Sequence, residues 1–137
     1  MKIQAYITFG GRCEEALAFY KEAIGAEVLG MMRWKDSPEA DMKGPPGYEE
    51  KVMNAMFRVG ETELMADDGM GEKTPEFKGM TLALNAASDA DTRRLFDALA
   101  QGGKVQMPLA KTFWTSSFGM LNDKFGVPWM VMTESAS

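Results

Sequence analysis

Apolar and polar residues alternate along several short stretches of the chain, which is the period expected for β-strands with two different faces. The predicted strands are residues 3–9, 26–34, 52–59, 63–67, 80–85 and 104–109. The third and fourth of these are expected to form a hairpin that turns near Gly60. On the strands predicted at residues 3–9 and 80–85, one face is uniformly apolar. We expect that face to pack against a helix and the opposite face to point away from the helix.

Two stretches show helical instead of alternating spacing. Residues 12–24 place apolar side chains three and four positions apart, and Gly25 is a natural C-terminal stop. A second helix is predicted to begin after Ser88, with Asp91 three residues later as a capping-box partner, and to end at Gly102. Polar stretches rich in glycine and proline, at residues 35–50 and 68–78, are predicted loops.

The order of these elements occurs twice along the chain. Like residues lie 77 positions apart in the two halves, as in the pairs Phe19 and Phe96, Gly25 and Gly102, and Val28 and Val105. The pattern predicts an α+β protein made of two βαβββ modules, about residues 1–68 and 79–135. Because half a chain of this size cannot bury its sheet alone, we expect the modules to pack as a single domain over residues 1–137.

The most aromatic part of the sequence is the stretch of residues 112–130, which reads TFWTSSFGMLNDKFGVPWM. It contains an Asp-Lys-Phe-Gly turn at residues 123–126, which suits a hairpin. Aromatic rings carry the largest apolar area of any side chains, so such a cluster either anchors a core or lines a ligand pocket. The sequence leaves both interpretations open.

Successive residues of a strand point to opposite faces of the sheet, a rule that we call strand parity. It places polar and large apolar side chains together on the faces away from the helices. If the two sheets curl toward each other, these faces line a cup of the kind that binds small molecules; otherwise they meet solvent. The candidate ligand-binding residues are Tyr6, Asn54, Met56, Arg58, Met65, Asp67, Trp114, Phe118 and Trp129. The two tryptophans would stack on the ligand. We expect Arg58 to form an ion pair with Asp67 across the hairpin, although it could instead orient an anionic ligand.

Composition narrows the possible functions. The chain has 137 residues and a net charge of −5, so it lacks the basic footprint of a nucleic-acid-binding protein. Cys13 is the single cysteine and is expected in the core, which suits a reducing, cytoplasmic compartment. The sequence contains no run of 18 apolar residues, so no membrane span is predicted. The sequence has no histidine, which excludes Cys/His zinc sites and histidine-assisted nucleophilic triads.

Three segments together resemble a known family. They are YITFGGRCEEALAFYKEAIGAEV at residues 6–28, ELMADD at residues 63–68, and TFW, FG and DKFGVPWM within residues 112–130. They are similar to the PhnB-like branch of the vicinal oxygen chelate superfamily, which includes glyoxalase I, bleomycin-resistance proteins and extradiol dioxygenases. The resemblance implies a glyoxalase-like fold with a curved mixed sheet around a central cup. Some relatives carry a demethylubiquinone methyltransferase label, but here no glycine-rich cofactor loop follows a strand.

The resemblance also implies a divalent metal that acts as a Lewis acid, with His, Gln and Glu ligands. The matching positions in this chain are Gln4 or Tyr6, Asn54, Met65 or Asp67, Thr81, and Met130 or Met132. One carboxylate with two amides makes a weak site for a hard cation. We therefore expect no tightly held metal and no cofactor.

The sequence favours a small-molecule-binding protein, of a sequestering or resistance type, with an aromatic-lined cup. The alternative is a metal-dependent lyase or dioxygenase with atypical ligands. A third interpretation assigns the apolar faces to dimerisation, since the superfamily implies a homodimer. The residues leave open whether a reaction is catalysed. We expect neither nucleic acid nor a membrane as a partner.

Overall fold

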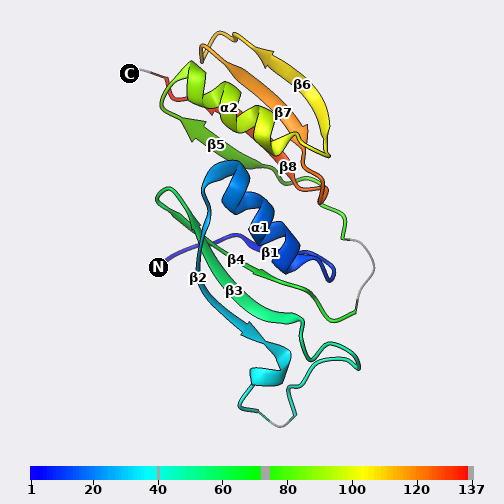
Figure 1. Cartoon of the computed structure of the whole chain (residues 1–137). Coiled ribbons are helices and arrows are strands. Elements are labelled where there is room, and N and C mark those ends of the chain that lie inside the picture. Colours follow the sequence, from blue (N-terminus) through cyan, green and yellow to red (C-terminus); the bar gives the residue numbers. More distant parts are fainter. Residues whose placement is uncertain (40, 72–74, 136–137) are drawn as a thin grey trace. The chain divides into compact units, whose positions relative to one another are not determined.

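The computed structural model describes residues 1–39, 41–71 and 75–135. The chain divides into two compact units, Met1–Pro75 and Glu76–Ser137. Each unit contains a four-stranded mixed sheet with an α-helix against it (Figure 1). The predicted α+β class and the repeated βαβββ module are thereby confirmed, whereas the single domain and the central cup, which depend on how the units are placed, stay predictions.

The first unit has its sheet in the order β1-β4-β3-β2. Its elements are β1 (Tyr6–Thr8), α1 (Cys13–Ile24), β2 (Glu27–Arg33), the 3-10 turn η1 (Trp34–Asp36), β3 (Val52–Val59) and β4 (Thr62–Asp67). Strand β1 runs parallel to β4, and the other neighbours are antiparallel. The hairpin predicted near Gly60 is the β3–β4 connection.

The second unit repeats this arrangement with the order β5-β8-β7-β6. Its elements are β5 (Leu82–Ala86), α2 (Asp89–Leu99), β6 (Lys104–Ala110), β7 (Phe118–Asn122) and β8 (Pro128–Thr133). Again the first strand is parallel to the last one and the remaining pairs are antiparallel. The two sheets therefore share one topology, as the 77-residue repeat predicts.

Helix α1 packs on one face of its sheet through aromatic side chains. The Tyr20 ring stacks on Phe57 of β3 with centroids 6.2 Å apart, and both residues are buried. The helix ends at Gly25, whose φ of 72° is the left-handed conformation that glycine adopts at low cost. Its first turn is capped by a residue that is distant in the sequence: Asp68 Oδ1 accepts a hydrogen bond of 2.7 Å from the backbone N of Cys13.

Helix α2 packs closely against β7. A Cβ atom on Gly119 would lie 2.7 Å from the ring of Phe96, so only glycine permits this approach. Ser88 caps the helix as predicted, accepting from the backbone N of Asp91 at 3.1 Å. The carboxylate of Asp91 pairs with Arg94, so the reciprocal half of the expected capping box is replaced by an ion pair.

One expectation for the first unit needs correction, and a second is confirmed with added detail. The first strand begins at Tyr6 and not at residue 3, because its ladder with β4 covers residues 6–8, and Ile3 is 96% exposed. Apart from η1, the described residues of the stretch 35–50 form a loop, as predicted. It folds over Trp34, which is 7% exposed, and a Cβ atom on Gly44 would lie 2.6 Å from that indole ring. Residue 40 of this stretch, like residues 72–74 of the second predicted loop, lies outside the described residues.

Within the described ranges, no helix has the length and apolar character needed to cross a membrane.

Candidate functional site

The face of each sheet that points away from its own helix, here called the distal face, carries most of the predicted site residues. In the first unit Tyr6 lies opposite Met65 on the neighbouring strand, and Met65 lies opposite Met56. In the next row Thr8 lies opposite Asp67. The alternate residues of these strands are buried toward α1, as Phe57 shows, so the predicted strand parity holds in this unit.

The best-defined polar contact on this face joins Tyr6 and Asp67. The Tyr6 hydroxyl donates to Asp67 Oδ2 at 2.9 Å, and the backbone N of Gly69 donates to Asp67 Oδ1 at 3.1 Å. Tyr6 is 46% exposed. Partial burial, the hydrogen bond to Asp67 and the charge of that carboxylate raise the pKa of Tyr6 to about 12. The phenol therefore stays neutral at physiological pH and acts as a fixed donor to the carboxylate.

Arg58 does not pair with Asp67, contrary to our expectation. Its guanidinium lies 2.8 Å from Glu27 Oε2, because strand β2 is the neighbour of β3 on the side away from β4. Glu63, which lies opposite Arg58 on β4, bonds with Lys2 at 3.3 Å. The charged row at this end of the face is thus made of ion pairs.

On the distal face of the second unit, strands β7 and β8 present a row of apolar side chains. Phe118 lies opposite Met132, and Met120 lies opposite both Met130 and Met107. This row of methionines matches the Met56–Met65 pair of the first unit, because both pairs join the third and fourth strands of their modules. Methionine is flexible and polarisable and suits surfaces that adapt to a bound molecule.

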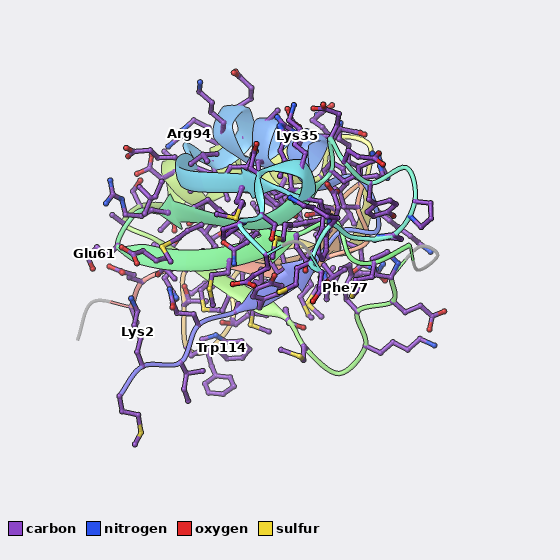
Figure 2. All side chains as sticks on the ribbon, turned by 90° about the horizontal axis from the view of Figure 1, so that it is seen from below. Lys2, Lys35, Glu61, Phe77, Arg94 and Trp114 are labelled. Atoms are coloured by element: carbon purple, nitrogen blue, oxygen red, sulfur yellow. The ribbon has the colours of Figure 1, made fainter. Side chains whose placement is uncertain are left out.

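Trp114 extends this apolar face. Its indole lies edge-on to the Phe118 ring, with ring centroids 5.3 Å apart. The centroid of the Phe113 ring is 4.8 Å from that of the Trp114 indole. Trp114 is 46% exposed and Phe118 is buried. Figure 2 shows Trp114 on the side of its unit away from Arg94 of α2. A large aromatic ring is therefore held by its neighbours and still accessible.

Trp129 does not share this face. It lies opposite Leu121, is 6% exposed, and packs on the helix side of the sheet. Its Nε1 donates to Asp123 Oδ2 at 2.9 Å. Asp123 Oδ1 also accepts from the backbone N atoms of Phe125 and Val127, which shapes the predicted turn. Trp129 is therefore a core residue of the hairpin, and we leave it out of the ligand contacts.

The structure thus divides the predicted site residues between two surfaces. Six of them share the distal face of the first unit: Tyr6, Asn54, Met56, Arg58, Met65 and Asp67. Trp114 and Phe118 share that of the second unit. Our sequence reasoning missed the buried Asp68, whose two oxygens accept from Cys13 N and Val52 N, because those partners are distant in the sequence.

Two surface cavities, each of about 520 Å³, lie at the ends of α1. The one at the helix start is lined by charged residues that already pair with each other, such as Arg12 with Glu15 at 2.7 Å and Arg33 with Glu14 at 2.6 Å. The hydrogen bond and charge of Arg33 lower the pKa of Glu14. We therefore assign no ligand to this cavity.

The residues present do not fit the divalent metal that the fold implies. Across the described ranges, no group of three or more Asp, Glu, Cys or His residues is arranged so that it could hold a metal ion. Asp67 is already engaged by Tyr6 and Gly69, and the matching positions Met130 and Met132 offer thioethers, which are soft ligands poorly suited to hard cations.

Comparisons with known proteins agree with this architecture. A family model described as 3-demethylubiquinone-9 3-methyltransferase matches residues 1–132. The chain is 33% identical to Protein YjdN of Escherichia coli strain K12, covering 96% of this chain and 94% of that protein.

Solved structures extend the likeness. Protein PA1353 of Pseudomonas aeruginosa is 42% identical, with a TM-score of 0.86 and 99% of each chain covered. The PhnB protein of Bacillus cereus is 31% identical, with a TM-score of 0.80 and coverage of 97% of this chain and 99% of that chain. A glyoxylase/bleomycin resistance protein/dioxygenase domain from Frankia sp. EAN1pec, 14% identical over 98% of this chain and 97% of that one, shares the fold with a TM-score of 0.67.

Proposed function

The chain belongs to the 3-demethylubiquinone-9 3-methyltransferase family, alongside YjdN- and PhnB-like proteins with the glyoxalase fold, and we propose that it binds a small organic molecule through the distal faces of its sheets. The site residues of this chain support this proposal. The observation that carries this proposal is Trp114, a half-exposed indole supported edge-on by the buried ring of Phe118.

An exposed tryptophan that is held rigidly is well suited to stack on a ligand. Full burial of an aromatic side chain removes roughly 150–250 Å² from water, and Trp114, at 46% exposed, still has about half of its surface available to a ligand. The position of Trp114 is already set by the Phe118 and Phe113 rings, so a ligand would not have to order it. The methionines on the same face, Met120 and Met130, would adapt to the ligand's edges. These features favour a planar or largely apolar ligand.

The three tryptophans allow a direct test by fluorescence. Trp114 is 46% exposed, whereas Trp34 and Trp129 are 7% and 6% exposed. We expect at least one compound in a library of planar aromatic and anionic molecules to quench the emission saturably. The quenching should be lost in Trp114→Phe and kept in the matched control Trp34→Phe. Absence of saturable quenching across the whole library would count decisively against the proposal.

We include the setting of this function in the proposal: a homodimer in the cytoplasm. The buried thiol of Cys13 suits a reducing compartment. The outer strand β2 exposes apolar side chains, including Val28, Leu29 and Met31, which would suit a protein interface. Sedimentation velocity at decreasing concentration should show a dimer that Val28→Lys weakens, and a monomer at all concentrations would remove the homodimer from the proposal.

A further inference from the structure

The charges on the distal face of the first unit do not balance. Arg58 is paired with Glu27, and Glu63 is bonded to Lys2. Asp67 accepts only from neutral donors, the Tyr6 hydroxyl and the Gly69 backbone N, and among the residues that the structure describes it has no salt bridge to a lysine or arginine. One negative charge is therefore left on this face without a cation.

The surroundings of this carboxylate are aromatic and apolar. The ring of Tyr6 is 46% exposed and is tied to Asp67 by its hydroxyl group. Met65 lies opposite Tyr6, and Met56 lies opposite Met65, so two thioether side chains continue the row. Both methionines and Asp67 are partly buried. A carboxylate, an aromatic ring and polarisable side chains thus share one surface.

We propose that this surface, formed by Tyr6, Asp67, Met56 and Met65, binds an organic cation of the alkylammonium class. The ammonium head lies against the Tyr6 ring, where the ring quadrupole attracts a cation, and within the field of the Asp67 carboxylate. Its alkyl groups contact the two methionine side chains. This inference rests on the proposed function, because it names a ligand class for one of the two distal faces.

The alternatives to a cation fit this surface less well. An anion would be repelled by the Asp67 carboxylate. Arg58, two residues from Met56 on β3, is already paired with Glu27. A neutral ligand would gain only apolar contact. The Tyr6 phenol, with its pKa raised to about 12, remains uncharged and keeps donating to Asp67, which holds ring and carboxylate in fixed relation.

The second unit provides an internal control. At the position equivalent to Asp67 its last strand carries Met132, and Ala83 stands where Tyr6 stands in the first strand. Its Met120–Met130 pair is otherwise equivalent to Met56–Met65. A cation that recognises the carboxylate and the ring should therefore contact the methionines of the first unit and leave those of the second unit unchanged.

Methionine methyl NMR can test this on the intact protein. The probe is choline, and the matched control is 3,3-dimethylbutan-1-ol, in which carbon replaces the charged nitrogen. Methyl signals of Met56, Met65 and Met130 are assigned with single Met→Leu variants. We expect choline to shift the Met56 and Met65 signals saturably, with little effect on Met130. The neutral alcohol should bind more weakly by a factor of roughly five or more, because the Coulomb attraction is lost.

Asp67→Asn should weaken choline binding by a similar factor of roughly five or more. Glu61→Gln, which removes the same charge from an exposed turn of the same unit, should leave binding almost unchanged. Equal binding of choline and the alcohol, no effect of Asp67→Asn, or no shift at all would overturn the cation assignment. These outcomes are distinct from failure of the proposed function, which is read from Trp114 in the other unit.

Discussion

Replacing Asp68 by alanine tests how the end of β4, and with it the neighbouring site residue Asp67, is held in place. Asp68 is 2% exposed. Its Oδ1 accepts from Cys13 N at 2.7 Å and its Oδ2 accepts from Val52 N at 2.6 Å. One side chain thus joins the start of α1, the start of β3 and the end of β4.

The expected cost follows from the two donors. A buried backbone N–H left without a partner costs about 1–3 kcal/mol, so Asp68→Ala should lower the free energy of unfolding by about 2–6 kcal/mol. Asp68→Asn keeps one acceptor oxygen and presents an amide group to the other donor. Its loss should therefore be smaller, about 1–3 kcal/mol, which corresponds to one unsatisfied donor.

The assay is urea denaturation at neutral pH, followed by far-UV circular dichroism and by tryptophan emission. Trp34 lies in the same unit as Asp68, so the Trp34 signal should move to lower urea concentration. Asp97→Ala is the control, because the Asp97 side chain is 58% exposed and its oxygen lies a long 3.9 Å from the Arg93 guanidinium. If Asp68→Ala lost less than about 1 kcal/mol, the capping role inferred from the two hydrogen bonds would be refuted.

Further predictions address packing and titration. Gly119→Ala should lower the free energy of unfolding by about 1–3 kcal/mol through overpacking, because the new Cβ would lie 2.7 Å from the Phe96 ring. Gly30→Ala is the control: a Cβ there would have no atom within 4 Å, so the same urea assay should show almost no change. Cys13 should react with a thiol reagent only on unfolding, since burial raises the pKa of its thiol; fast labelling of the native protein would contradict this. The difference in absorbance at 295 nm between the wild type and Tyr6→Phe, which isolates one of the three tyrosines, should show Tyr6 ionising near pH 12 instead of 10. Stability should fall as the pH rises through that interval, because the native state retains the proton that the unfolded state releases. Ionisation at the ordinary pH would disprove the Tyr6–Asp67 contact.

Much of the fold could be predicted because its signals are local or periodic. Alternation placed Tyr6, Met56 and Met65 on one face, and the register of the sheet confirms that they are neighbours. The 77-residue repeat predicted two equivalent sheets, and Gly25 and Ser88 marked helix ends that the structure contains. These features depend on the strand and helix periods and on backbone capping, which a sequence shows directly.

The missed features depend on which strands become neighbours. Arg58 pairs with Glu27 and not with Asp67 because β2 lies beside β3, an order that alternation alone does not determine. Trp129 lies on the helix side because the 123–126 turn sets the phase of β8, with Asp123 holding its indole. Trp34 is buried by contact with a loop rather than by a regular element. Each case is a tertiary contact that overrides a local pattern.

The most direct test of ligand binding at Trp114 is fluorine NMR of protein labelled with 5-fluorotryptophan. The three tryptophans give three signals, and Trp114→Phe assigns the exposed one. With a ligand found by fluorescence screening, we expect the Trp114 signal to shift saturably while those of Trp34 and Trp129 stay in place. A Trp114 signal that does not respond to any such compound would contradict small-molecule binding on this face.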